Sequence, residues 1–280
     1  MAINLSQYNS ESQNFSLATN ECFNNLASFY DSLYSDINAA DDEIGSKLDK
    51  LIKTYIKKDP QEIKILDLGS GTGIGLKHLA LQGYSITLVD FSNDMLSKAK
   101  DFILSKNDSE KLKVNFIESS YNDFYESETN EKYDVIFARG NSLDYIFEED
   151  ELEHLKLLIV KHLALNGIFY CSGRDWSKTI QEYGNSFFVN NKINLTCPYI
   201  VHYNLFWMSS SILLNKISFV SISEQNAIDV DGFFLPIHPL DYKALISYLI
   251  KHNIKLIDQP ENLEGIGNEY FQAYLFQRTI

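Results

Sequence analysis

The strongest constraint on the fold comes from residues 63–75, where a short apolar run leads into a loop with glycine at every second position. The run has the length and composition of a buried strand, and Asp67 interrupts it near its end. Gly69, Gly71 and Gly73 have no side chain to keep a ligand away from the backbone, and a helix pattern follows them. We therefore predict a buried strand, a nucleotide-type binding loop and a helix, in this order.

Spacing excludes two well-known glycine loops. The dinucleotide fingerprint requires a third glycine, and Ile74 or Leu76 stands at its position, depending on where the motif begins. The phosphate-binding P-loop requires lysine directly after glycine, whereas Lys77 here follows Leu76. What remains is an acid followed by alternating glycines, with an ordinary strand-to-helix turn as the alternative interpretation.

Length and charge narrow the class of protein. A chain of 280 residues with 45% hydrophobic residues can build a core domain with an insertion or an added cap. Its net charge of −14 repels phosphate backbones and anionic lipids, so we expect neither nucleic acid nor a membrane as partner.

The three cysteines are far apart in sequence, which favours reduced structural thiols and no metal site. Without an apolar run of membrane-span length or a signal pattern, we expect a cytoplasmic protein.

Strand and helix patterns alternate along most of the chain, which predicts right-handed crossovers between parallel strands. We therefore predict an α/β fold with a doubly wound, mostly parallel seven-stranded sheet, an N-terminal helical cap and an antiparallel hairpin insertion. The hairpin is expected at 199–208 and 212–222, where apolar and polar residues alternate. The predicted core strands are 63–68, 85–89, 112–117, 133–138, 168–172, 255–257 and 270–277.

The predicted parts of the chain, in order, are a tail with a helical lid (1–41), the core (42–180), the insertion (181–232) and the end of the core (233–280).

The N-terminal part is expected to cover the site. Residues 1 to about 18 are polar and show no period that would bury a face, so we expect order to begin near Asn20. From 21 to 34, aromatic and apolar residues recur every three or four positions, which predicts a helix with an aromatic stripe. Tyr30 and Tyr34 lie on this stripe and need polar partners if buried, so they are candidates for the site as well as for the core.

Ligands of doubly wound sheets bind at the carboxyl ends of the strands. Asp90 lies at such an end, 23 residues after Asp67, where a carboxylate can accept hydrogen bonds from both hydroxyls of a ribose. The residues expected to converge at this edge are Gly69, Asp90, Ser120, Asn141 and Arg174.

The acid and alternating glycines resemble motif I of the class I S-adenosylmethionine-dependent methyltransferases. This resemblance extends over roughly residues 42–180 and 234–280. It implies S-adenosyl-L-methionine as cofactor and S-adenosyl-L-homocysteine as product, with Asp90 on the ribose and Phe91 and Met95 beside the adenine; a core methionine is the alternative for Met95. The cofactor-binding residues that it implies are Asp67, Gly69, Ser70, Gly71, Gly73, Asp90, Phe91, Met95, Ser120, Tyr121 and Arg139.

Residues 33–36, 140–142 and 173–176 are similar to stretches of the glycine and sarcosine N-methyltransferases. This resemblance implies that Arg174 grips the carboxylate of an amino-acid acceptor, for which its planar fork is suited. It also implies that Asn141 orients the acceptor nitrogen. Tyrosines that the family has near its carboxyl end are missing here, which favours an acceptor different from glycine or bulkier.

We expect in-line methylation of a small molecule, at the nitrogen of an amine or amino acid. An O-methyltransferase of a small natural product and a regulatory module that binds the cofactor without turnover are the alternatives, and a homo-oligomer stays open. The candidate catalytic residues are Tyr30, Tyr34 and Asn141. The candidate substrate-binding residues are Arg174, Asn141, His202 and His238, with a structural role as the alternative for both histidines.

Overall fold

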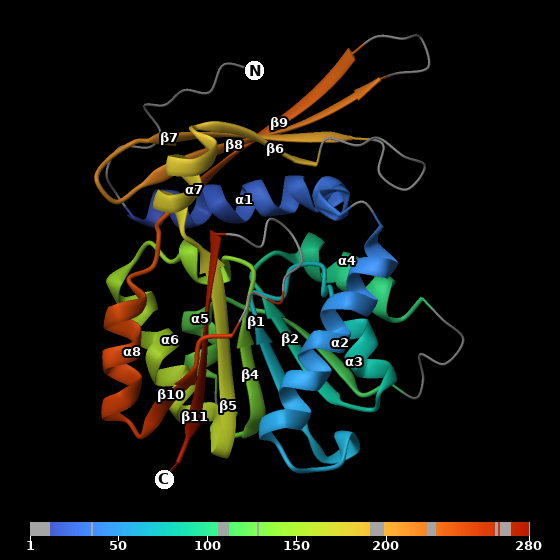
Figure 1. Cartoon of the computed structure of the whole chain (residues 1–280), viewed down its shortest axis with the longest axis vertical. Helices are drawn as coiled ribbons and strands as arrows, with labels where there is room; N and C mark the ends of the chain where they lie inside the picture. The colour runs from blue at the N-terminus through green and yellow to red at the C-terminus, as the bar shows by residue number, and fades with distance from the viewer. Residues whose placement is uncertain are drawn as a thin grey trace.

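The computed structural model describes residues 12–34, 36–105, 112–127, 129–190, 199–222, 228–260, 263 and 270–279. These residues form a larger and a smaller β-sheet. One helix lies between the smaller sheet and the carboxyl ends of the strands of the larger sheet (Figure 1).

The larger sheet contains seven strands, and its architecture confirms the predicted fold class. Its strands are β1 (Lys64–Leu68), β2 (Ser85–Asp90), β3 (Val114–Glu118), β4 (Tyr133–Ala138), β5 (Leu163–Arg174), β10 (Ile254–Asp258) and β11 (Phe271–Arg278). They are ordered β10-β11-β5-β4-β1-β2-β3. Strands β1 to β5 run parallel, whereas β11 runs antiparallel to both β5 and β10.

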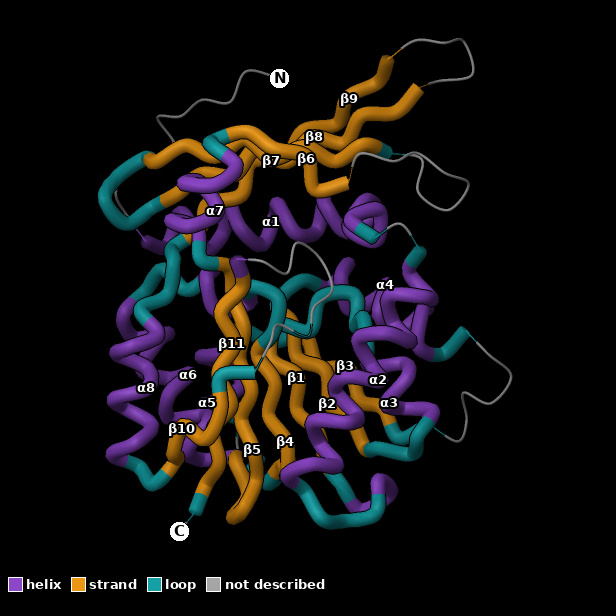
Figure 2. Tube along the Cα trace, in the orientation of Figure 1, coloured by secondary structure: helices purple, strands orange, loops and turns teal. Residues whose placement is uncertain are grey.

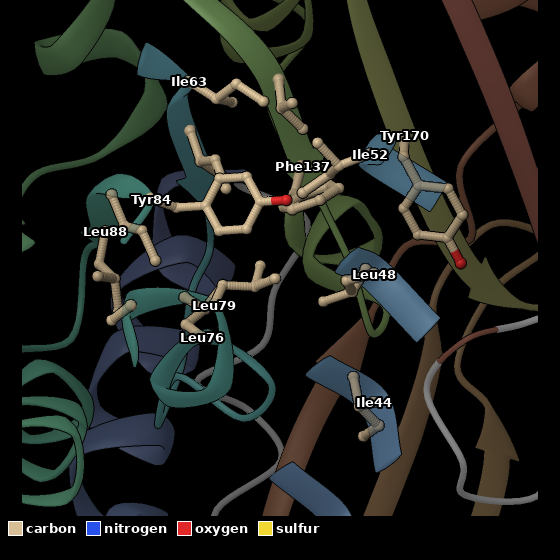
Figure 3. Close-up of a cluster of buried hydrophobic side chains, with 14 of the residues drawn as sticks. Ile44, Leu48, Ile52, Ile63, Leu76, Leu79, Tyr84, Leu88, Phe137 and Tyr170 are labelled. Atoms are coloured by element: carbon tan, nitrogen blue, oxygen red, sulfur yellow. The ribbon is translucent and has the colours of Figure 1, made fainter. Parts of the chain in front are cut away.

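Helices cover both faces of this sheet (Figure 2). One face packs against α2 (Ile37–Tyr55), α3 (Leu76–Leu81) and α4 (Asn93–Ile103), and the other against α5 (Tyr121–Glu126), α6 (Glu149–His162) and α8 (Tyr242–Lys251). The side chains of β1 alternate between the two cores: Ile65 points to the first, and Leu66 and Leu68 point to the second. Figure 3 shows Leu48 and Ile52 of α2 in the first core, which fixes α2 next to the loop that follows β1.

The cap consists of α1 (Ser12–Tyr30), α7 (Trp176–Tyr183) and the second sheet, which contains β6 (Ser186–Asn190), β7 (Ile200–Trp207), β8 (Leu213–Ile222) and β9 (Ile228–Ile237). In Figure 1, α1 lies across the carboxyl ends of the core strands, with the second sheet above it. Leu26 and Ala27 of α1 pack against Val201, Ile217 and Phe219 of the second sheet. Apolar burial therefore joins the second sheet to α1, the helix that covers the core.

The cap differs from expectation at two points: where α1 begins, and to which part of the fold Phe234 and Leu235 belong. Helix α1 begins at Ser12 rather than near Asn20. Phe15 is buried there, and its ring stacks on Phe147 at 5.5 Å between centroids, a long-range contact that a local polar composition does not reveal. The hairpin with its turn near 209–211 is present, but it belongs to a four-stranded sheet. Strand β9 carries Phe234 and Leu235, which we had assigned to the end of the core.

Short helices at 121–126 and 176–183 were not predicted, since they have too few residues to show a period.

Cys22 and Cys171 are free and buried, and Cys197 lies outside the described residues. Among the described helices, none has both the length and the apolar content of a membrane span.

Candidate active site

A pocket opens at the carboxyl ends of the core strands, beneath α1. Its walls come from the loop after β1, the ends of β2 and β4, the start of α5 and the lid helix. Its lining residues are Phe23, Tyr30, Tyr34, Asp67, Gly69, Ser70, Gly71, Thr72, Gly73, Ile74, Asp90, Phe91, Met95, Tyr121, Arg139, Gly140, Ser142 and Tyr145.

The glycine loop forms the floor of the pocket. Gly69 has φ +67°, and a Cβ there would lie 2.5 Å from Cβ of Ser142, so only glycine fits. Gly71 also has a positive φ, of +54°, but a Cβ there would meet no atom within 4 Å. The loop backbone thus approaches its neighbours closely at Gly69 and faces open pocket at Gly71.

Asp90 ends β2 and reaches the same loop. Its Oδ2 accepts a hydrogen bond from the backbone N–H of Gly71 at 2.7 Å, and its Oδ1 accepts one from Ser92 at 2.9 Å. Burial raises the pKa of Asp90 to about 6, the backbone N–H groups of Ser92 and Gly71 oppose the rise, and the charge of Asp67 adds to it. Burial therefore disfavours the ionised form of Asp90, although two backbone hydrogen bonds hold its side chain in place. A ligand that donates further hydrogen bonds to the carboxylate would stabilise this ionised form.

A buried ion pair closes the floor behind the loop. Arg139, at the end of β4, donates from Nη2 to Oδ2 of Asp67 at 3.1 Å and to the carbonyl oxygen of Ile74 at 3.0 Å. Both charged side chains are almost fully buried, at 7% and 1% exposure. The pair links β4 to both ends of the glycine loop and so fixes the shape of the loop.

Several buried polar atoms in the pocket have no hydrogen-bond partner in the described part of the chain. They are Oδ1 of Asp67 and the hydroxyl oxygens of Ser70, Thr72 and Ser142. Leaving such atoms unpaired costs about 1–3 kcal/mol each, and all four belong to residues that line the pocket, so the lining is rich in polar groups. The ribose hydroxyls and the amino and carboxylate groups of S-adenosylmethionine fit such a lining.

Aromatic and apolar side chains form the upper walls. Phe23 of α1 contacts Phe91 and Tyr145 edge-to-face, at 5.7 and 4.9 Å between centroids. Met95 is 1% exposed and also lines the pocket, so it serves the core and the wall together. Ser120 does not line this pocket but lines its continuation beyond Asp90, together with Tyr121.

The lid helix is tied to the Asp90 end of the pocket through amide side chains. Ser92 donates its hydroxyl hydrogen to Oδ1 of Asn24 at 2.6 Å, and Asn24 donates to Oδ1 of Asn20 at 3.0 Å. Because Ser92 also donates its N–H to Asp90, α1 and the candidate ribose acceptor share one hydrogen-bonded chain.

Asn141 and Arg174 lie together, but neither is among the residues that line the pocket. Asn141 has φ +73°, and its Oδ1 accepts a hydrogen bond from the backbone N–H of Arg174 at 2.6 Å. This bond joins the loop after β4 to the end of β5. The guanidinium of Arg174 is buried over the rings of Phe271 and Trp176, at 4.7 and 5.5 Å.

Neither candidate histidine is among the residues that line the pocket. His202, on β7, shares hydrogen bonds with Ser186 and Asn204, both at 2.9 Å. The Nδ1 atom of His238 lies 2.8 Å from the carbonyl oxygen of Ile146. Tyr30 and Tyr34 do line the pocket, one from the end of α1 and the other from the residue that follows the short helix Asp31–Leu33.

Sequence reasoning missed Asp41, which holds the glycine loop from outside. This buried residue of α2 accepts hydrogen bonds from the backbone N–H groups of Gly75, at 2.7 Å, and His78, at 3.0 Å. It thereby caps the start of α3, where Gly75 itself offers no side chain. No motif marks an acid so far along the chain from the loop, so only the fold reveals it.

Replacing Asp41 with alanine is expected to lower the free energy of unfolding by roughly 1–2 kcal/mol, as for the loss of a helix cap. Chemical denaturation followed by circular dichroism measures the change. Asp42→Ala is the control, because its side chain is 78% exposed. Equal stability of the two variants would show that the cap at Gly75 does not depend on Asp41.

Comparison with known proteins places this site in a family context. Residues 65–167 match the model of a family described as a methyltransferase domain. A ubiquinone biosynthesis O-methyltransferase from Rickettsia typhi is 29% identical over 126 residues, which are 45% of this chain and 47% of that protein. The chain thus spans about half the length of the curated relatives it matches.

Solved structures share the fold over most of the chain. An S-adenosylmethionine-dependent methyltransferase from Clostridium acetobutylicum superposes with a TM-score of 0.67 at 19% identity, covering 92% of this chain and 100% of that one. An amino pentose methyltransferase from Micromonospora echinaspora gives 0.62 at 10% identity, covering 85% and 92%. These matches do not support the narrower resemblance to glycine and sarcosine N-methyltransferases. Residues 65–167 are thus similar to a methyltransferase domain, within a chain that has the fold of S-adenosylmethionine-dependent methyltransferases.

Proposed function

We propose that this chain is an S-adenosylmethionine-dependent methyltransferase that acts on a small molecule. The observation that carries the proposal is the pocket at the strand ends, where the glycine loop, Asp90 and four unpaired polar atoms surround one ligand-sized space. In this proposal Asp90 accepts hydrogen bonds from the ribose, and Gly71 lets the cofactor lie against the backbone. The residues that contact the cofactor are those assigned from the sequence, together with Thr72 and Ser142.

The cofactor supplies a methyl group that is already activated on a sulfonium. The protein therefore has to position the acceptor, whose lone pair forms the new bond to the methyl carbon while the carbon–sulfur bond breaks and its electron pair stays on sulfur. Holding two reactants at attack distance contributes up to about 7–11 kcal/mol in well-oriented cases. Phe23, Tyr30, Tyr34 and Tyr145 surround the space above the cofactor loop and are the side chains placed to do this.

We infer an amine or amino acid as acceptor, with Arg174 binding an anionic group on it. Within the described residues, no carboxylate forms an ion pair with Arg174, and its Nε has no hydrogen-bond partner. Asp144 lies in electrostatic range, but its oxygens accept from Trp176 Nε1 and the N–H of Leu240 instead. Burial lowers the pKa of Arg174, so a negative group from the pocket side, past Tyr145, would compensate its buried charge. Asn141 acts here by holding the Arg174 backbone.

Methylation of oxygen is the second candidate, because curated relatives of this chain are named O-methyltransferases. Isothermal titration with S-adenosylhomocysteine tests cofactor binding. Incubation with S-adenosylmethionine and separate panels of amines, amino acids and phenols then tests transfer. Binding with turnover on amines supports the first candidate, and turnover on phenols alone supports the second. Binding without turnover on any panel would favour a regulatory module.

If Arg174 binds the acceptor, Arg174→Leu should raise the acceptor KM about tenfold or more, the scale for losing a charged hydrogen bond, and spare cofactor affinity. Steady-state kinetics with the acceptor found in the panels measures KM. Lys178→Leu is the control, since it removes a nearby cation whose side chain is 68% exposed. An unchanged KM in Arg174→Leu would return Arg174 to a structural role.

A further inference from the structure

The pocket continues past Asp90 into a second lobe beside the ends of β2 and β3. We call this the β3 lobe; it shares Gly69, Asp90, Phe91, Tyr121, Ser142 and Tyr145 with the main pocket and adds Ser119, Ser120 and Glu151. The opposite end of the main pocket is lined by Thr72, Ile74 and Arg139. Under the proposed function, Asp90 holds the ribose between these two ends. The adenine then lies in the β3 lobe, since Phe91 and Tyr121 wall that side.

Most polar side chains of the β3 lobe are already engaged with the protein. Ser119 donates to the carbonyl oxygen of Ser120, and the hydroxyl of Ser120 bonds to Asp123 at 2.7 Å. Tyr121 donates to the carbonyl oxygen of Ser142 at 3.3 Å. The hydroxyl hydrogens of these three residues are therefore engaged with the protein, and what remains on them is the weaker acceptor capacity of neutral hydroxyl oxygens.

Glu151 is different, because it brings a carboxylate into the lobe from the first turn of α6. Burial raises its pKa to about 7, the charge of Glu148 adds to the rise, and the backbone N–H of Phe147 opposes it. A carboxylate has about four acceptor positions, so one backbone bond leaves most of them for a ligand. Tyr121 lies in electrostatic range of Glu151, which places the acid next to the wall of the lobe.

We propose that Glu151 recognises the adenine of the cofactor by accepting a hydrogen bond from its exocyclic 6-amino group. This inference rests on the proposed function and adds a base-specificity residue to it. The 6-amino group offers hydrogen-bond donors, and a carboxylate offers acceptors. A base with oxygen at position 6 would instead bring a second acceptor against the carboxylate, which disfavours it.

Helix capping is the competing role for Glu151. An acid three residues into a helix commonly accepts a hydrogen bond from a backbone N–H just before the helix, as the Phe147 contact does here. Glutamine preserves that capping acceptor but replaces the second carboxylate oxygen with a hydrogen-bond donor. Glu151→Gln therefore separates capping from base recognition.

The experiment compares two ligands by isothermal titration at pH 8, where Glu151 is ionised: S-adenosylhomocysteine and its analogue with hypoxanthine in place of adenine. Wild-type protein should bind the adenine compound about tenfold more tightly or better, the scale of one charged hydrogen bond. In Glu151→Gln and Glu151→Ala this ratio should fall below about threefold, because the repulsion of the 6-oxygen is gone. Glu149→Gln, an exposed acid of the same helical turn, should keep the wild-type ratio.

A ratio that stays at the wild-type value in both Glu151 variants would overturn the inference and leave Glu151 as a capping residue. A wild-type protein that prefers neither ligand while binding both would overturn it as well. Failure of wild-type protein to bind S-adenosylhomocysteine at all would instead overturn the proposed function. The two failures are thus distinguishable in one set of titrations.

Discussion

Arg139→Met is expected to lower the free energy of unfolding by about 3–5 kcal/mol, the cost of leaving a buried charge without its partner. Asp67 is 1% exposed and loses the guanidinium that lies 3.1 Å from one of its oxygens. The carbonyl oxygen of Ile74 loses its donor at the same time. Urea denaturation of the variant and of wild-type protein, monitored by circular dichroism, measures the difference.

The double variant Asp67→Leu/Arg139→Met is the control for charge. Because it removes both charges together, it should be less destabilised than Arg139→Met alone. A loss below about 1 kcal/mol in the single variant, the level of an exposed ion pair, would contradict a buried, stabilising pair at this position.

Asp90→Ala should weaken binding of S-adenosylhomocysteine by about 1–3 kcal/mol, the range for losing charged hydrogen bonds. The carboxylate also orients the N–H of Gly71 at 2.7 Å, so its loss affects the ligand and the loop together. Isothermal titration at pH 7.5 gives the affinity. Asp94→Ala, which changes an exposed acid at the start of α4, should bind as wild-type does.

The same group predicts how affinity depends on pH. With a pKa of about 6 in the free protein, Asp90 is protonated below pH 6 and ionised at pH 7. Ribose hydroxyls donate to the ionised form, so ligand binding lowers this pKa, and affinity falls as the pH drops through 6. Above pH 7 the contribution of Asp90 is constant. The ionisation of Glu151, with a pKa of about 7, adds a separate rise in affinity between about pH 6 and 8 under the inference drawn above. Asp90→Asn should remove the part of this dependence that is centred near pH 6 and leave the part due to Glu151. A wild-type affinity independent of pH between 5 and 7 would contradict the ribose assignment.

The core could be predicted from sequence because its signals are local and repeated. Strand β4 occurs at 133–138 as expected, since the apolar run at 135–138 suits a strand that is covered on both faces. The cap could not be predicted to the same depth. Strand β9 alternates only over residues 228–231, after which Gly232 and Pro236 interrupt the pattern. Residues 223–227, which separate it from β8 in the sequence, contain no glycine that would signal a hairpin. The start of α1 depends on the contact of Phe15 with Phe147, far along the chain.

The candidate site divides in the same way. Gly69, Gly71 and Asp90 lie together because the order of parallel strands brings their carboxyl ends to one edge. His202 and His238 were candidates only because histidine can bind substrates or move protons, and no sequence motif supported them. Their hydrogen bonds include those to Ser186 and to the carbonyl oxygen of Ile146, and neither lines the pocket. Asp41 and Glu151 were missed because each reaches the pocket or its loop from a helix on another layer. A single sequence does not encode that proximity in any local pattern.

Helix α1 contacts the pocket with one side and the second sheet with the other, so it separates the two. Phe23 and Tyr30 line the pocket, while Leu26 and Ala27 pack against the second sheet. The cofactor loop, by contrast, is built from the core and fixed by Asp41 and Arg139. Repacking the second sheet can therefore reshape the roof of the pocket while its floor stays unchanged. Diversification of acceptors around a constant methyl donor can proceed in this way, through surfaces that touch neither ligand.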